Sequence, residues 1–152
     1  MFEIVKTNLK GGKRMAIDVH LHFNGNCRDA VSFYTKVFSL EEPKFMTYEE
    51  APQQANMTLN ENNKKLIMYT SLKIYGSNVM FSDVTSDMPV TLGDNIVLNV
   101  GIDNFEEIAL LFNKLKEGGT VLMDLQETFF AKSYGLLIDK FGIPWQLVYE
   151  AN

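Results

Sequence analysis

The chain has 152 residues, of which 46% are hydrophobic and 22% charged, with a net charge of -5. This composition is that of an ordinary globular protein, long enough for one domain or for two small halves that share a core. The negative charge argues against nucleic acid or an anionic membrane surface as a partner. No run approaches the roughly 20 apolar residues of a membrane span. The single cysteine, Cys27, excludes an intrachain disulfide, and together with the lack of a signal peptide it predicts a cytoplasmic protein.

The first residues differ from the rest of the chain. A purine-rich ribosome-binding site ahead of a start codon would encode a segment such as Lys10-Gly11-Gly12-Lys13-Arg14-Met15. We interpret residues 1–15 as an N-terminal extension, with Met15 as the natural start and residues 1–14 as an upstream read-through. A true extension of the protein is the alternative.

Strict alternation then predicts the first strand. Its apolar face comprises Ile17, Val19, Leu21 and Phe23, and its polar face comprises Asp18, His20 and His22. Gly25 ends the strand, and Asn26 has the spacing to Asp29 that is typical of a helix N-cap. Apolar residues at helical spacing continue to about Leu40 and predict an amphipathic helix.

Three more strands complete the first half. We expect a strand at residues 44–49, a polar loop over residues 51–64, and a hairpin of residues 66–74 and 79–83 that turns at Gly76-Ser77. The first module, residues 16–84, is therefore predicted as β-α-β-β-β. A turn-rich linker follows at residues 85–94.

The same order of elements restarts in residues 95–152. Alternation from Ile96 to Ile102 predicts a strand, and Asp103 with Glu106 has the spacing of a capping box. A helical stripe follows, made of Ile108, Leu111, Phe112 and Leu115. Strands are expected at residues 120–126, 134–138 and 145–150. An internal repeat of this kind restricts the fold strongly, to an α+β architecture of two βαβββ modules.

Several segments resemble the PhnB-like proteins, which also carry the label 3-demethylubiquinone-9 3-methyltransferase-like. The matching segments are Phe23-Asn24-Gly25-Asn26-Cys27-Arg28-Asp29-Ala30, Val79-Met80-Phe81-Ser82-Asp83, Leu125-Gln126-Glu127-Thr128-Phe129-Phe130 and Asp139-Lys140-Phe141-Gly142-Ile143-Pro144-Trp145-Gln146-Leu147. The resemblance spans residues 16–150. It implies the glyoxalase/bleomycin-resistance fold of the vicinal-oxygen-chelate superfamily, with two modules around a shared cavity, within a homodimer.

In metal-using members of that superfamily, ligands come from the first strand of each half and from the last strand. The first strand here offers His20 and His22, the only histidines of the chain, which are weak metal candidates or polar residues of a wet sheet face. The corresponding positions of the other two strands hold Asn99 and Gln146. Amide oxygens are weak ligands without negative charge, so we predict no metal or other cofactor.

The remaining predicted pocket residues are Tyr69, where relatives often carry His, and Phe130, part of a cluster of aromatic residues. The aromatic residues of this cluster form either a wall of the cavity or ordinary core and dimer contacts. If Trp145 packs on the helices, alternation places Gln146 towards the pocket. Cys27 begins a helix but has no general base near it in sequence, which argues against a catalytic thiol.

Two functions remain open. One is a protein that binds a small organic molecule between its modules, and the other is a metal-dependent lyase, isomerase or dioxygenase of the glyoxalase type. The missing acidic ligand favours binding. The methyltransferase label has no support in the residues, because no glycine-rich turn follows a strand as a methyl-donor site of that kind requires.

Overall fold

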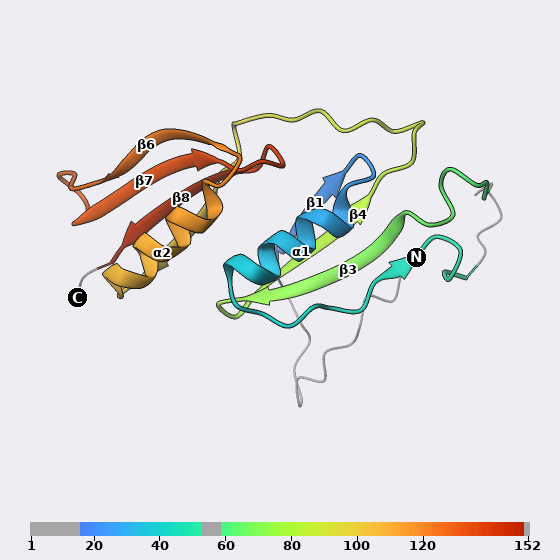
Figure 1. Cartoon of the computed structure of the whole chain (residues 1–152), viewed down its shortest axis with the longest axis horizontal. Helices are drawn as coiled ribbons and strands as arrows, with labels where there is room; N and C mark the ends of the chain where they lie inside the picture. Colours follow the sequence, from blue (N-terminus) through green and yellow to red (C-terminus); the bar gives the residue numbers. More distant parts are fainter. Residues whose placement is uncertain (1–15, 53–58, 151–152) are drawn as a thin grey trace.

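The computed structural model describes residues 16–52 and 59–150, so the interpretation of residues 1–15 lies outside it. Two modules with the same order of elements follow one another (Figure 1). The first contains β1 (Val19–Phe23), α1 (Cys27–Val37), β2 (Met46–Thr47), β3 (Ile67–Ile74) and β4 (Ser77–Asp83). The second contains β5 (Leu98–Ile102), α2 (Phe105–Leu115), β6 (Thr120–Gln126), β7 (Ser133–Ile138) and β8 (Pro144–Tyr149). The predicted α+β fold of two βαβββ modules is confirmed.

The two sheets have the same topology. Their strand orders are β1-β4-β3-β2 and β5-β8-β7-β6. In each sheet the first strand pairs in parallel with the last strand of its module, as in the pairs Val19 with Val79 and Leu98 with Trp145. The other pairings are antiparallel. The repeat thus lies in the topology, although the residues of the two halves differ.

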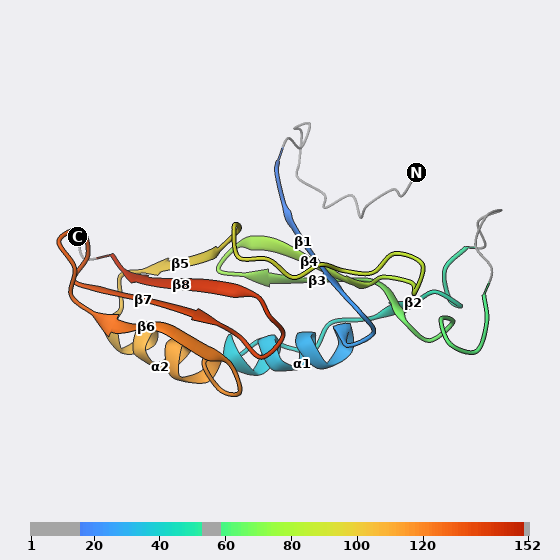
Figure 2. The ribbon, with the colours of Figure 1, turned by 90° about the horizontal axis from the view of Figure 1, so that it is seen from above.

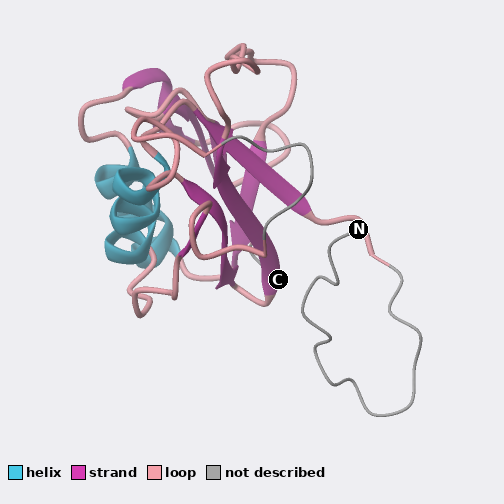
Figure 3. Cartoon of the chain, turned by 90° about the vertical axis from the view of Figure 1, so that its right-hand side faces the viewer, coloured by secondary structure: helices cyan, strands magenta, loops and turns pink. Residues whose placement is uncertain are grey.

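Both helices cover the same side of the molecule. Figure 2 shows α1 and α2 beneath the two sheets, and Figure 3 shows the same two layers from the side. The helix-facing residues of both sheets form one core with the apolar stripes of α1 and α2. Trp145 packs against Tyr34 and Phe38, with ring centroids 5.8 and 5.6 Å apart. The opposite face of each sheet carries no described helix, and this uncovered face is called the open face below.

Several ends of elements differ from the predictions. The first strand begins at Val19, and Ile17 is fully exposed rather than packed on a helix. The hairpin turns at Tyr75-Gly76, whose φ angles of 48° and 83° are those of a type I′ turn, and Ser77 already belongs to β4. The side chain that caps α2 belongs to Asn104, which accepts from the Glu107 N–H at 3.1 Å, and not to Asp103.

The helix α1 begins and ends differently from the prediction as well. Asn26 occupies the N-cap position but makes no side-chain capping bond. The Cys27 N–H instead donates to Asp83 Oδ1 at 2.9 Å, so a carboxylate at the end of β4 caps the helix from another element. The helix ends at Val37 instead of near Leu40, and Ser39 follows with a φ of 54°.

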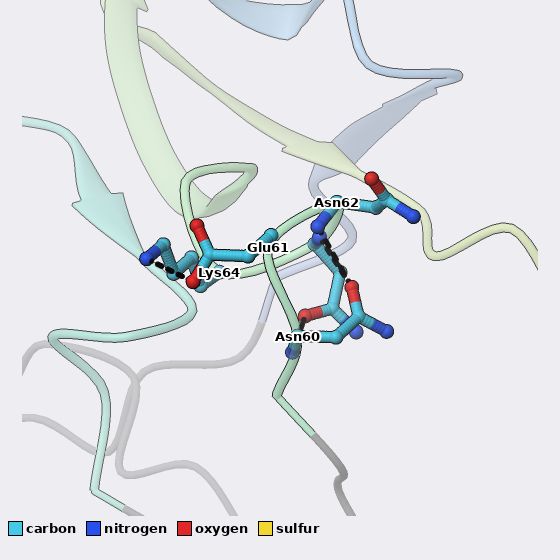
Figure 4. Close-up of polar contacts among 5 residues, drawn as sticks. Asn60, Glu61, Asn62 and Lys64 are labelled. Carbon is cyan, nitrogen blue, oxygen red and sulfur yellow. Dashed lines mark hydrogen bonds and ion pairs between the residues drawn. The ribbon is translucent and has the colours of Figure 1, made fainter.

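The loop before β3 is held by its own side chains (Figure 4). Asn60 Oδ1 accepts from the backbone N–H groups of Asn62 and Asn63 at 2.8 and 3.0 Å, and Lys64 Nζ lies 2.7 Å from Glu61 Oε1.

The two-residue β2 is much shorter than the strand predicted at residues 44–49. In the part of the chain that the structure describes, no helix has the length and apolar character of a membrane span.

Candidate functional site

The two histidines lie together on the open face of the first sheet. His20 and His22 alternate with Leu21 and Phe23, which pack into or against the core. The register pairs His20 with Met80 and His22 with Ser82 of the neighbouring β4. The two imidazole rings meet edge to face, with centroids 4.6 Å apart.

Ser82 holds one of these histidines. His20 Nε2 lies 3.0 Å from Ser82 Oγ, and Ser82 is only 5% exposed. Burial, and to a smaller extent the neighbouring His22, lower the pKa of His20. Ser82 was not among the predicted site residues. Alternation along the strand could have identified it. Ser82 and Met80 are two residues apart with the buried Phe81 between them, so both side chains belong to the open face.

Tyr69 belongs to the same open face. The next residue of β3, Thr70, is buried with its hydroxyl donating to the Lys44 carbonyl, and Thr70 pairs with Phe81 of β4. Tyr69 therefore points away from the helix side and lies between Met46 of β2 and the β4 strand. The first sheet thus presents imidazoles, a phenol and a hydroxyl on one surface.

A chain of hydrogen bonds crosses the open face of the second sheet. Tyr134 Oη donates to Gln146 Oε1 at 2.9 Å, and Gln146 Nε2 donates to Asn99 Oδ1 at 2.8 Å. The three residues come from β7, β8 and β5, which are adjacent strands, and the register places Asn99 directly beside Gln146. Because Trp145 and Leu147 are buried against the helices, alternation turns Gln146 to the open face.

Phe130 lies at the Tyr134 end of this chain. Its ring meets that of Tyr134 edge to face at 5.0 Å, and it contacts Phe129 in the same manner at 5.1 Å. The loop that carries both rings is closed by Thr128, whose backbone N–H donates to the Ala131 carbonyl at 2.9 Å. Phe129 is fully exposed and Phe130 is 58% exposed.

The six predicted residues therefore form two groups. His20, His22 and Tyr69 lie on the first sheet, and Asn99 and Gln146 lie on the second, with Phe130 in the loop between β6 and β7. Among the described residues, no hydrogen bond or ring contact joins one group to the other. A groove of about 460 Å³ lies between the modules beside Asn99, and half of its lining residues are aliphatic, among them Val19, Val79, Val97 and Val100.

The donor set of these residues does not suit a divalent cation. The side-chain oxygens of Asn99 and Gln146 already accept hydrogen bonds, and an amide brings no negative charge. Across residues 16–52 and 59–150, no three His, Cys, Asp or Glu side chains gather closely enough to hold a metal ion. Cys27 is fully buried, and burial together with the nearby Asp83 raises the pKa of its thiol, which disfavours the thiolate that a nucleophilic cysteine requires.

Three relatives are similar over nearly the whole chain. Protein YjdN of Escherichia coli (strain K12) is 30% identical over 140 residues, which cover 88% of this chain and 94% of YjdN. The solved structure of protein PA1353 from Pseudomonas aeruginosa is 31% identical with a TM-score of 0.78, covering 91% of this chain and 100% of that one. The PhnB protein from Bacillus cereus is 27% identical with a TM-score of 0.65, covering 88% and 98%.

The fold is shared more widely. A glyoxalase/bleomycin resistance protein/dioxygenase family enzyme from Burkholderia phytofirmans PsJN has a TM-score of 0.55 at 17% identity, covering 86% of this chain and 97% of that one, a likeness of fold alone. The model of the family described as 3-demethylubiquinone-9 3-methyltransferase matches residues 15–148. With its two four-stranded sheets in the glyoxalase/bleomycin-resistance arrangement, the chain belongs to this family, whose relatives of known structure include PhnB.

Proposed function

We propose that the protein binds a small organic molecule that carries a hydrogen-bond-accepting oxygen, and that it does so without a metal. The observation that carries this proposal is the directed chain from Tyr134 through Gln146 to Asn99. Small-molecule sites are mostly apolar and contain a few placed polar groups that fix the orientation of the ligand, and Asn99 is such a group in a partly aliphatic groove.

The direction of the chain defines the group that meets the ligand. The phenol hydrogen of Tyr134 is used on Gln146, and one Gln146 N–H is used on Asn99 Oδ1. Each amide has two donor hydrogens, so Asn99 Nδ2 keeps both of its own, and it has no bonded acceptor among the described residues. A carbonyl, amide or carboxylate oxygen of a ligand would complete this set.

The apolar part of the ligand has two surfaces available. The aliphatic groove between the modules opens beside Asn99, and the rings of Phe130 and Tyr134 lie at the other end of the amide chain. Flat apolar molecules gain contact area and favourable ring geometry against such aromatic edges. Benzamide and benzoate combine a flat ring with acceptor oxygens and are therefore suitable probes.

We further propose a cytoplasmic homodimer in which a second copy covers the open faces. Large apolar side chains are exposed on the second module, including Ile96, Leu122, Phe129 and Phe130. Exposed apolar side chains of this size are candidates for an interaction surface. We propose that in this dimer the His20 surface of one copy and the Asn99 surface of the other contact the same ligand.

The test is ligand-observed NMR with benzamide and benzoate, on the wild type and on Asn99→Asp. Aspartate keeps an oxygen for Gln146 but has no N–H to offer, so binding of both probes should weaken at least tenfold, the loss of one hydrogen bond at about 1.4 kcal/mol. Asn95→Asp, in an exposed turn, is the matched control and should leave binding unchanged. Equal affinity in both variants would contradict the proposal.

Elemental analysis of the purified protein addresses the metal. We expect less than one divalent ion per ten chains. Stoichiometric metal that is lost in His20→Asn or His22→Asn would instead support a metal-dependent lyase, isomerase or dioxygenase.

A further inference from the structure

We propose that Ser82 is a positioning residue whose hydroxyl fixes His20 as the neutral tautomer with its hydrogen on Nδ1, so that His20 offers that N–H to the ligand oxygen. The tautomer assignment rests on the contact between Ser82 Oγ and His20 Nε2. Its use by a ligand rests on the proposed function.

The geometry singles out His20 of the two histidines. In the parallel register Ser82 stands beside His22, yet its Oγ lies 3.0 Å from His20 Nε2, the imidazole two residues earlier on β1. The bond thus runs diagonally across the strand pair. Ser82 belongs to β4, which lies between β1 and β3, and the register pairs it with His22 of β1.

The direction of the hydrogen bond follows from counting donors. A hydroxyl has one hydrogen and two lone pairs, and a neutral imidazole has one N–H and one bare nitrogen. Ser82 is 5% exposed, and within the described residues its side chain bonds only to His20. If Nε2 carried the hydrogen, the buried Ser82 hydrogen would have no acceptor, which is a costly arrangement. An unused lone pair costs less, so Ser82 donates to Nε2 and the imidazole hydrogen resides on Nδ1.

The surroundings keep this imidazole neutral near pH 7. Burial and the adjacent His22 both lower the pKa of His20. The other titratable side chains of this open face are Asp18, which directly precedes β1, and Tyr69 and Lys73 of β3. Within the described residues neither Tyr69 nor Lys73 makes a hydrogen bond or ion pair with His20. A neutral His20 with an Nδ1–H is therefore a neutral donor on the first sheet, in addition to that of Asn99 on the second sheet. Two such donors favour an acceptor-rich ligand.

The experiment is a long-range ¹H–¹⁵N correlation spectrum of the ligand-free protein at pH 7.5. The chain has two histidines, and His22→Asn assigns the signals of the remaining one. An unprotonated ring nitrogen resonates far downfield of a protonated one. In the wild type the downfield nitrogen of His20 should be Nε2. Ser82→Ala should shift His20 towards the Nε2–H form, and Ser82→Thr, which keeps the hydroxyl, should restore the wild-type pattern.

Ser71→Ala is the matched control, because Ser71 lies on the same open face opposite Met80 and loses the same atom. It should leave the His20 pattern unchanged. A wild-type Nε2–H tautomer, or an unchanged pattern in Ser82→Ala, would overturn the assignment. For the ligand role, Ser82→Ala should weaken benzamide binding three- to tenfold, and unchanged binding would overturn it. If no probe bound the wild type, the proposed function would fail while the spectra still decided the tautomer.

Discussion

Tyr34 of α1 donates its hydroxyl hydrogen to Asp139 Oδ2, in the turn between β7 and β8, across an O···O distance of 2.6 Å. The bond connects the first module to the second inside the core, since Tyr34 is fully buried and Asp139 is 3% exposed. Burial and the neighbouring carboxylate raise the pKa of Tyr34 well above its ordinary value.

Asp139 uses both oxygens fully, which makes it hard to replace. Oδ2 also accepts from Trp145 Nε1 at 2.8 Å, and Oδ1 accepts from the backbone N–H groups of Phe141 and Ile143 at 2.9 and 3.1 Å. In Asp139→Asn one of the two acceptors becomes an NH₂ that faces two donors. We expect a loss of about 3 kcal/mol in the free energy of unfolding, measured by urea denaturation.

Two further variants test that explanation. Tyr34→Phe removes one donor and should cost about 1–2 kcal/mol, less than Asp139→Asn. Asp94→Asn, at an exposed position, should cost less than about 0.5 kcal/mol. If Asp139→Asn unfolded at the same urea concentration as Asp94→Asn, the four hydrogen bonds to Asp139 would not stabilise the fold.

Two glycines of the second sheet should respond differently to alanine. A Cβ on Gly135 would lie 2.7 Å from Phe112 Cε2 and 3.0 Å from Leu125 Cδ2, in the core between β7 and α2. A Cβ on Gly101 would meet the flexible end of Glu150 on the open face, which can move away. Gly135→Ala should therefore lower the free energy of unfolding by about 1–3 kcal/mol, and Gly101→Ala by less than about 1 kcal/mol. The reverse order in urea denaturation would mean that the two faces are assigned wrongly.

The order of elements was predictable because it depends on local patterns. Alternation marked β1 and β5, and helical spacing marked the buried stripe of α2 that contains Ile108 and Leu111. The side that Gln146 faces also followed from alternation, once Trp145 was placed in the core. These features require only neighbours within one element.

Features that depend on pairing between distant segments were not predictable. The register of β5 with β8 sets Asn99 beside Gln146, and the register of β1 with β4 brings Ser82 to His20. Likewise the carboxylate that caps α1 comes from Asp83, 56 residues away along the chain. The sequence pattern favoured the nearer candidate, Asn26, because local spacing carries no information on contacts between residues far apart in the chain.

The proposed dimer predicts an effect of the exposed aromatic loop. Sedimentation equilibrium at micromolar concentration should give twice the chain mass of 17.3 kDa. Replacing Phe129 and Phe130 together by serine removes apolar surface that is exposed in the single chain, so it should weaken dimerisation at least tenfold without lowering the free energy of unfolding of the monomer. Tyr75→Ser, at another exposed aromatic position, is the control. A wild type that sedimented as a monomer would refute the dimer.

Cys27 predicts a pH dependence of stability. Burial, and secondarily Asp83, raise the pKa of its thiol in the folded state, while in the unfolded chain the thiol titrates near its ordinary value of about 8.5. The folded state therefore holds a proton that the unfolded state has lost, so stability is complete below about pH 8.5 and declines as pH rises above it. Between about pH 8.5 and 10, before the tyrosines with raised pKa values (Tyr34, Tyr48 and Tyr75) contribute, the decline should reach about 1.4 kcal/mol per pH unit. Cys27→Ala should lower stability at pH 7 but flatten this slope, as measured by urea denaturation under reducing conditions. Equal slopes in the two proteins would show that the thiol titrates alike in both states.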